Sequence, residues 1–558
     1  MNKQLIIPKP SALRLFRVTL IAGILPAIFL LSTQTSQAGS ATWLASPATG
    51  DWNTATNWTA GGPPNGPSDT ATFASSSMTS VSISASPTEV NGIVFNAGAS
   101  AFTITANPPH ILSPLTISGV GITNNSGITQ NFVTAVNGAD GNFGLISFTN
   151  SATAGSLTAF TNKGSAFAGV TGGETSFLNT STAGNGTFTN DGGAVSGASG
   201  GFTEFNSSST AGNATFTNDG GAVSGVGGFT QFYFSSTAGN ATFTNNGGAV
   251  SGAGGGGVGF LTMSTAGNAT LIANSGLGGG TAGSFQFFDG SHGGTARVEV
   301  FGNGTGDTTN GNLDISSHNA PGVTIGSVEG TGNVFLGAFR LTVGSNNLTT
   351  TFSGAIQDGG FNGGTGGSLT KTGTGKLTLS KASTYTGGTT ITKGTLLVTN
   401  TTGSGTGTGA VQVNKGTLGG TGKITGAVTV GTGTSSGAIL LPGKSATNPG
   451  ILTINSALTF NSLSTYQCVL KRTTIKVSKA TVLGVTINSN VPFTFVDTGT
   501  GTLATGTVFT VINNTSANPI FGTFSNLADG SVFTSNGNNF QVSYEGGTGN
   551  DLTLTVVP

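Results

Sequence analysis

The chain has 558 residues, of which only 6% are charged, and its 18 Lys and Arg balance 18 Asp and Glu. Gly contributes 96 residues and Phe contributes 36. This much Phe at so low a charge excludes a disordered chain, which needs low hydrophobicity and high net charge. Because Gly, Thr, Ser and Asn outnumber the good helix formers, a helical protein is excluded as well. We therefore predict a β-rich fold with many tight turns.

The N-terminus has the pattern of an export signal. Four basic residues within the first 17 positions precede an apolar run from Val18 to Leu31, and Ser36 and Ala38 are small residues at the cleavage-determining positions. A retained membrane anchor is the alternative, but this run contains Pro26 and is shorter than the roughly 20 residues that span a bilayer. We predict a signal peptide at residues 1–38 and an extracellular or cell-surface location for the mature chain.

An internal repeat organises the middle of the chain. The pentapeptide Ser-Thr-Ala-Gly-Asn recurs at spacings of 28, 27 and 28 residues, as Ser181–Asn185, Ser209–Asn213, Ser236–Asn240 and Ser264–Asn268. An apolar residue follows each Asn by three positions, and a second Phe series keeps the same period: Phe188, Phe216, Phe243 and Leu271, and Phe177, Phe205, Phe232 and Phe260. Such a period indicates stacked units that bury apolar surface only against their neighbours.

Strand alternation specifies the stack. It places Ala214 and Phe216 on one face and Thr215 and Thr217 on the other, so Phe216 is expected inside, between Phe188 and Phe243. We predict an all-β fold, a right-handed parallel β-helix (β-solenoid) over roughly residues 85–470 with one rung per 20–28 residues. Two Asn ladders should bond from rung to rung. They comprise Asn185, Asn213, Asn240 and Asn268, which we expect to be buried at a corner, and Asn190, Asn218 and Asn245.

The chain changes character at about Leu369. The segments Leu369-Thr370-Lys371-Thr372-Gly373-Thr374-Gly375, Tyr385-Thr386-Gly387-Gly388-Thr389 and Gly394-Thr395-Leu396 follow one another. Together they resemble the autotransporter-associated β-strand repeat of bacterial secreted and surface proteins, and the looser likeness extends over most of the mature chain. The resemblance implies an adhesin-like or structural β-solenoid. Autotransporters end in a membrane barrel, whereas this sequence stops at Val557-Pro558, so we expect no transmembrane barrel in this chain.

These patterns divide the chain into five predicted segments. They are a signal peptide at 1–38, an irregular Trp-containing cap at 39–84, the β-solenoid at 85–363 (clearest at 177–275), the autotransporter-associated repeat region at 364–470, and a small C-terminal β region at 471–558.

Few residues are candidates for chemistry. Asp191 and Asp219 occupy equivalent positions one rung apart, as a glycosidase pair requires, but both lie in Asp-Gly-Gly turns, which favours a turn role. Gly546–Asp551 matches the start of a Ca²⁺-binding nonapeptide but occurs once, so a tight turn is the better interpretation. His110, His292 and His318 lack metal-ligand spacing. We predict no catalytic, cofactor-binding or metal-binding residue, and no cofactor.

Three further groups have a structural and a binding interpretation. Trp43, Trp52 and Trp58 are predicted to cap the first rung rather than to bind a sugar ring. Lys471, Arg472, Lys476 and Lys479 are predicted to form a solvated strand face rather than an anionic contact site. Cys468, which shares a strand face with Tyr466 and Leu470, is predicted to be a buried, inert thiol.

The sequence therefore predicts a secreted or cell-surface structural, adhesin-like β-solenoid that is not an enzyme. Its expected partner is a cell-surface polysaccharide or another extracellular polymer, and not a nucleic acid. The alternatives are an extracellular glycan-binding module that uses the Trp or basic cluster, and a carbohydrate-active β-helix enzyme of the pectate-lyase kind.

Overall fold

The structure is a computed structural model that describes residues 39–59, 62–83, 87–107, 115–138, 141–304 and 306–558. The predicted signal peptide at 1–38 and His110 lie outside these residues. The described part of the chain contains no α-helix and only two 3-10 turns, Ala55–Asn57 and Arg472–Thr474. It forms two compact units, the first comprising the residues up to Ser264 with Asn274–Ser284, and the second comprising Thr265–Ala273 with Phe285–Pro558.

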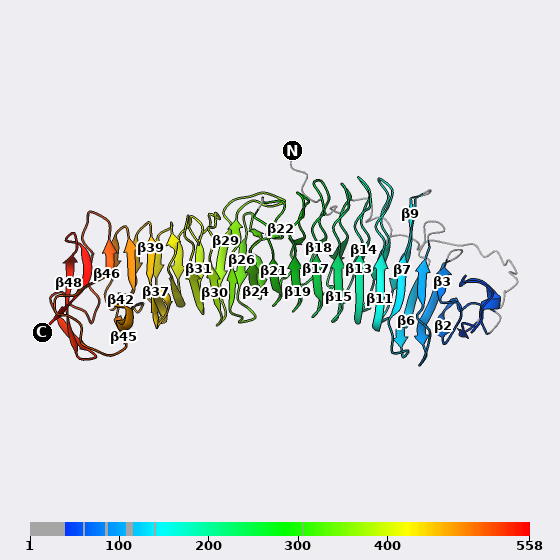
Figure 1. Cartoon of the computed structure of the whole chain (residues 1–558), viewed down its shortest axis with the longest axis horizontal. Coiled ribbons are helices and arrows are strands. Elements are labelled where there is room, and N and C mark those ends of the chain that lie inside the picture. The colour runs from blue at the N-terminus through cyan, green and yellow to red at the C-terminus, as the bar shows by residue number, and fades with distance from the viewer. Residues whose placement is uncertain (1–38, 60–61, 84–86, 108–114, 139–140, 305) are drawn as a thin grey trace, which may run out of the picture. The chain divides into compact units, whose positions relative to one another are not determined.

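The first unit stacks short parallel strands in two sheets (Figure 1). One sheet contains β1 (Ala41–Thr42), β2 (Gly66–Phe73), β4 (Thr88–Phe95), β6 (Leu115–Asn124), β10 (Leu145–Phe148), β12 (Glu174–Phe177), β14 (Phe202–Phe205), β16 (Phe229–Phe232) and β18 (Gly257–Phe260). The other contains β3 (Ser80–Ile83), β5 (Thr103–Ala106), β7 (Gln130–Thr134), β11 (Ser156–Asn162), β13 (Asn185–Asn190), β15 (Thr215–Asn218) and β17 (Thr242–Asn245).

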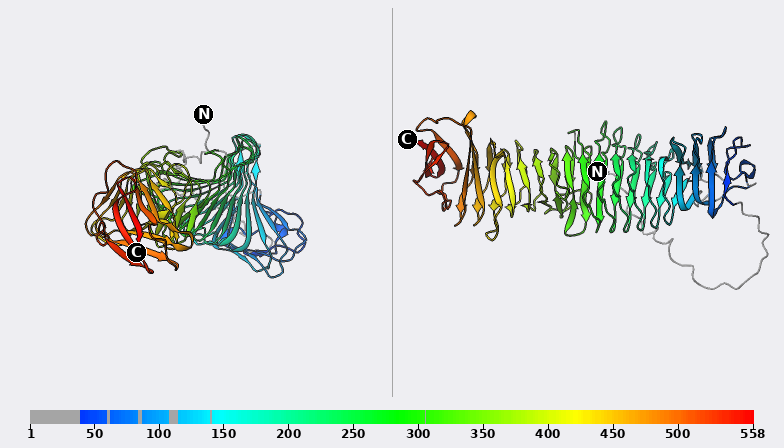
Figure 2. Two further views of the ribbon diagram at one scale, coloured as in Figure 1. Left: turned by 60° about the vertical axis from the view of Figure 1, so that its left-hand side comes forward. Right: turned by 90° about the horizontal axis from the view of Figure 1, so that it is seen from below.

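The second unit continues the same construction with three stacks of parallel strands, which Figure 2 shows from two further directions. The first stack contains β22 (Asn312–His318), β25 (Asn333–Phe335) and β28 (Ala355–Gln357). The second contains β19 (Thr270–Ala273), β21 (Arg297–Val300), β24 (Ser327–Gly330), β27 (Thr350–Phe352), β30 (Lys376–Leu379), β32 (Thr395–Val398), β34 (Gly416–Gly420), β37 (Ala438–Ser445), β41 (Thr465–Lys471) and β45 (Phe493–Thr498). The third contains β23 (Gly322–Ile325), β26 (Arg340–Val343), β29 (Ser368–Lys371), β31 (Thr389–Ile391), β33 (Val411–Val413), β36 (Val428–Val430), β40 (Leu458–Phe460) and β44 (Val485–Ile487).

The C-terminal segment changes from parallel to antiparallel pairing. β35 (Lys423–Ile424), β39 (Ile451–Ile454), β43 (Lys479–Val482) and β46 (Val508–Asn514) pair in parallel, and β46 then joins the antiparallel strands β49 (Asp551–Val557), β48 (Asn538–Gly546) and β47 (Val532–Ser535). The parallel ladder therefore gives way to an antiparallel sheet in the C-terminal segment.

The predicted all-β, parallel β-solenoid is confirmed, but parallel pairing extends beyond the predicted 85–470. It begins at Ala41, which pairs with Ala71, and it persists to Val482, which pairs with Asn514. The segment predicted as an irregular cap therefore already contains rungs, and the C-terminal β region shares the solenoid ladder. Short strands with irregular loops, as at β1 and β2, concealed this periodicity.

The core of the first unit is two columns of stacked Phe rings. As predicted, Phe216 lies between Phe188 and Phe243, with ring centroids 4.8 and 4.6 Å away, and all three are fully buried. The second Phe series stacks in the same way, and Phe205 meets Phe216 edge to face at 5.8 Å. Stacked and edge-to-face contacts are the favoured geometries of aromatic pairs, so the two columns hold the rungs in register.

The two Asn ladders both form, but only one is buried. Asn190, Asn218 and Asn245 are fully buried, and the Asn190 amide donates to the Asn218 side-chain carbonyl and the Asn218 amide to that of Asn245, each over 2.7 Å. Asn213 donates to Asn185, and Asn240 to Asn213, over 3.1 Å, but this first ladder is exposed to solvent. The prediction that Asn185, Asn213, Asn240 and Asn268 are buried at a corner is therefore wrong.

This difference predicts unequal costs for two substitutions. Asn218→Ala removes the partner of the Asn190 amide, the Asn245 carbonyl and the Thr230 hydroxyl in a buried site, so it should lower the free energy of unfolding by about 2–3 kcal/mol. Asn213→Ala should cost less than about 1 kcal/mol, because water replaces its bonds. Denaturant titration of both variants measures the difference. Equal losses would show that burial of the ladder does not control its contribution.

Candidate functional site

A regular surface of the first unit is an outward-facing array of Asn and Thr. We call it the Asn–Thr face, and it comprises Asn185, Thr187, Thr189, Asn213, Thr215, Thr217, Asn240, Thr242 and Thr244. These residues lie on or just before β13, β15 and β17. The stacked Phe rings of these three strands, and hence their rungs, are 4.6–4.8 Å apart. The face has no charged side chain. It presents amides and hydroxyls in three columns that can hydrogen-bond to an uncharged polymer.

Asp191 and Asp219 lie beside this face but are occupied by structural contacts. Asp191 forms an ion pair with Lys163 at 3.0 Å, and Asp219 accepts a hydrogen bond of 2.8 Å from Asn246. The amide of Asn274 in turn donates to Asn246 over 2.9 Å. The two carboxylates thus belong to a polar column along the Gly-Gly turns, as their turn interpretation predicts.

The Gly546–Asp551 segment is the turn between β48 and β49. Gly546 pairs with Asp551 across that antiparallel hairpin, and the buried Asp551 carboxylate accepts the backbone N–H of Asn514 at 2.8 Å. The ring nitrogens of the buried His318 contact the carbonyl oxygens of Asn319 and Ser291 at 2.5 and 2.7 Å, and His292 is exposed. Among the residues that the structure describes, no three His, Cys, Asp or Glu side chains come together as metal ligands.

The three Trp residues form the core of the first rung. Trp58 lies edge-on to Trp43 and Trp52 at 5.1 and 4.9 Å, and all three are at most 3% exposed. Their indole N–H groups donate to the carbonyl oxygens of Met78, Pro64 and Trp52. Because these rings are covered and their polar atoms are bonded, they cannot stack on a sugar. The Trp residues therefore have a structural role inside this rung.

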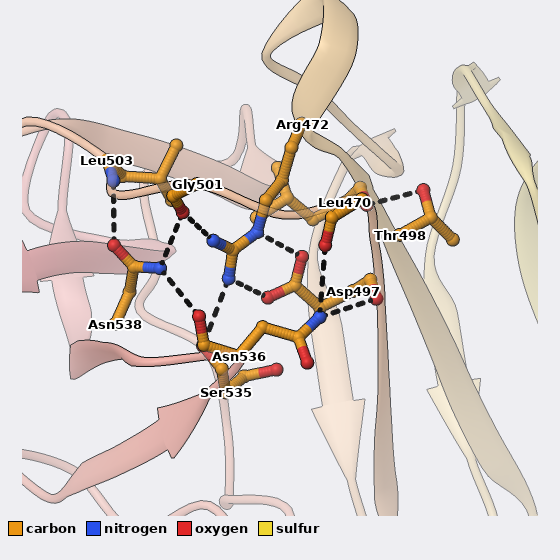
Figure 3. Close-up of polar contacts among 10 residues, drawn as sticks. Leu470, Arg472, Asp497, Thr498, Gly501, Leu503, Ser535, Asn536 and Asn538 are labelled. Atoms are coloured by element: carbon orange, nitrogen blue, oxygen red, sulfur yellow. Dashed lines mark hydrogen bonds and ion pairs between the residues drawn. The ribbon is translucent and has the colours of Figure 1, made fainter.

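The basic cluster is not a uniform solvated face, and that prediction is wrong for Arg472. Its guanidinium is buried and forms a two-pronged ion pair with the buried carboxylate of Asp497, in which Nε lies 2.7 Å from Oδ1 (Figure 3). It also donates to the carbonyl oxygens of Gly501 and Ser535. Lys476 is exposed, and Lys471 and Lys479 are half-buried.

The Arg472 site connects three segments of the C-terminal region. Asn536 donates to the Asp497 carbonyl oxygen at 3.1 Å, and Asn538 bonds to both Gly501 and Leu503 (Figure 3). The 3-10 turn, the loop after β45 and the β47–β48 turn therefore share one polar network. Its role is to fasten the antiparallel strands onto the last parallel rung.

Cys468 is buried beside Tyr466 and Leu470, as predicted, and its thiol donates to the Ser478 carbonyl oxygen at 3.8 Å. Burial raises the pKa of the Cys468 thiol and that of the Tyr466 hydroxyl, which donates to the Val511 carbonyl oxygen. A thiol that stays protonated in an apolar site is a poor nucleophile.

Sequence reasoning missed Lys371, a polar residue of the autotransporter-associated repeat that points inward. It is 1% exposed, and its ammonium donates to the carbonyl oxygens of Thr372, Gly373 and Lys393. Tyr385 of the same repeat is fully buried with its hydroxyl against Thr389. These two polar residues of the repeat therefore complete its core.

Burial lowers the pKa of Lys371 to about 8, below the 10.5 expected in the unfolded chain. Between these values the unfolded chain binds the proton more strongly, so this group makes the free energy of unfolding rise with pH. The raised pKa values of Cys468 and Tyr466 act in the opposite direction. We therefore expect wild type to gain about 1 kcal/mol relative to Lys371→Met between pH 8 and 9.5. Paired denaturant titrations test this, and parallel pH profiles would contradict it.

The comparison with protein families agrees with the repeat. Residues 369–398 match the passenger-associated-transport-repeat family. No curated protein matches the chain. Among solved structures, that of the Haemophilus influenzae Hap adhesin matches with a TM-score of 0.27 and 11% identity, over 88% of this chain and 64% of that chain. This chain thus spans less than two thirds of that structure's length. Within the described residues, no helix is long and apolar enough to cross a membrane.

Proposed function

We propose that this chain, which carries a passenger-associated-transport-repeat, is a secreted or cell-surface structural, adhesin-like β-solenoid without catalytic activity. Residues 1–38 would direct its export, and the Asn–Thr face would contact a cell-surface polysaccharide or another extracellular polymer. The observation that carries the proposal is the repeated rung, which displays the same uncharged side chains at a fixed spacing in successive strands.

Three features support this function over the alternatives. The Trp cluster is buried, so it offers no stacking surface for a sugar. Arg472 of the basic cluster is buried in an ion pair with Asp497, so it is not available to contact an anionic ligand. The paired Asp191 and Asp219 are bonded to Lys163 and Asn246, as turn residues are. A repeated array of weak hydrogen bonds suits an extended polymer, because contacts in successive rungs act together.

Location can be tested in the producing bacterium. Antibody labelling of intact cells and assay of the culture medium should detect the mature chain, and deletion of residues 1–38 should abolish both signals while the chain remains in the cell lysate. Retention of the unaltered chain inside the cell would contradict the proposal.

Activity and binding can be tested on the purified chain. Incubation with pectin, alginate and insoluble neutral polysaccharides should release no unsaturated or reducing ends, while sedimentation with an insoluble polymer should deplete the chain from solution. Replacing Thr215 and Thr217 with Lys should weaken sedimentation, and Lys479→Ala, which lies away from the Asn–Thr face, should not. Sustained cleavage that Asp191→Ala abolishes would establish the enzyme instead.

A further inference from the structure

The exposed Asn ladder has a sequence property that the buried ladder lacks. Each of its members is followed two positions later by Thr, in Asn185-Gly186-Thr187, Asn213-Ala214-Thr215, Asn240-Ala241-Thr242 and Asn268-Ala269-Thr270. Asn-x-Ser/Thr is the acceptor sequence for N-linked sugars. The buried Asn190, Asn218 and Asn245 have Gly at that position. Of the two ladders, only the exposed one therefore carries the acceptor sequence, which also occurs outside the ladders, for example at the buried Asn400 and Asn514.

The strand geometry presents this sequence to an enzyme. Because successive side chains alternate between faces, Asn213 and Thr215 point to the same outward side, and both are exposed. The intervening Ala214 is buried. The amide that would receive the sugar and the hydroxyl that a transferase recognises are therefore accessible together.

Asn213 can accept a sugar without losing its two ladder bonds. Each side-chain amide has two N–H groups. Asn213 uses one of them to reach the Asn185 carbonyl, and Asn240 uses one to reach that of Asn213. Substitution of the other hydrogen leaves the donor and the carbonyl acceptor in place.

We propose that Asn185, Asn213, Asn240 and Asn268 are acceptors for N-linked sugars supplied by a glycosyl phosphate donor. The Nδ2 atom attacks the anomeric carbon of the donor, forming an N–C bond as the C–O bond to the phosphate breaks. The phosphate-bearing group leaves with the electron pair of that bond, and the amide loses one proton to a base of the transferase. No oxidation or reduction occurs.

Composition gives these sugars a physical role. Only 6% of the residues are charged, and the Asn–Thr face has none, so it lacks the charges that keep flat sheet surfaces apart. Bulky, hydrophilic sugars along one column would keep such faces from associating. Because adjacent rungs lie only 4.6–4.8 Å apart, sugars on every rung would crowd one another, so we expect partial occupancy of the Asn column, which leaves the two Thr columns of the Asn–Thr face open to the proposed polymer.

Mass spectrometry of the chain purified from the producing bacterium tests the proposal. No Lys or Arg lies between Lys163 and Arg297, so chymotrypsin, which cleaves after Phe, is the suitable protease. We expect sugar masses on at least one of the four residues, and none on Asn190, Asn218 or Asn245. Single-hexose increments would indicate a nucleotide-activated donor, and an oligosaccharide increment a lipid-linked one.

Two controls make the result specific. Asn57 also has a Thr two positions later, but it is fully buried and its amide donates to Thr49 and Asp51, so it should remain unmodified. Thr215→Val keeps the size of the side chain and should abolish modification at Asn213 only. Detection of all four Asn residues solely in unmodified peptides would overturn the proposal, as would modification of Asn213 that persists in Thr215→Val.

Discussion

Arg472→Ala is expected to lower the free energy of opening of the C-terminal region by about 3–5 kcal/mol. The substitution leaves the Asp497 carboxylate buried without its partner, and it removes one donor from each of the carbonyl oxygens of Gly501 and Ser535, of which Gly501 keeps the Asn538 amide. Breaking one side of a buried pair costs this much because the remaining charge has lost its water. Native-state hydrogen exchange across β45, β47 and β48 measures the loss.

Two variants show whether the cost comes from the buried charge. Arg297→Ala removes an Arg that pairs with Glu299 and Glu329 at the surface, and it should cost less than about 1 kcal/mol. The double variant Arg472→Met with Asp497→Leu removes both charges and should recover part of the stability. If the double variant is no more stable than Arg472→Ala, the hydrogen bonds to Gly501 and Ser535, and not the unpaired carboxylate, dominate.

The sequence was sufficient for the stack because its strongest signal is a period. Phe188, Phe216 and Phe243 recur with an unbroken alternation around them, which defines both the rung and its inward side. The burial of the three Trp residues and of Cys468 could also be predicted, because large or apolar side chains are usually buried. The positions of the first and last rungs could not be predicted, because β1 and β46 lie in stretches where loop lengths vary and the sequence has no period.

The errors concern polar residues, and alternation itself explains them. Counted from the inward Phe188, Asn190 is two positions away and also points inward, whereas Asn185 is three positions away and points outward. Arg472 follows the inward Leu470 by two positions, and Lys371 follows the inward Leu369 by two. Arg472 is predicted to be solvated because of its charge, and Lys371 receives no prediction, although the phase of each residue in its strand indicates an inward side chain. Polarity failed because carbonyl groups or a carboxylate inside the solenoid satisfy these groups.

Phe216→Ala is expected to lower the free energy of unfolding of the first unit by about 3–5 kcal/mol. The ring is fully buried, stacks on Phe188 and Phe243 and meets Phe205 edge to face, so its removal loses burial and leaves a cavity between rigid rungs. The neighbouring rungs cannot close on this cavity without breaking their own backbone ladders. Denaturant unfolding gives the total loss, and hydrogen exchange locates it.

Phe234→Ala is the matched control for Phe216→Ala. This Phe belongs to the same unit, but its side chain is 57% exposed at a corner, so its truncation should change stability by less than about 0.5 kcal/mol. Because rungs of a solenoid couple mainly to their neighbours, Phe216→Ala should weaken protection most in β13, β15 and β17 and little at residues 369–398. Uniform loss of protection over both segments would instead mean that the chain unfolds as one cooperative body, in which no rung has a stability of its own.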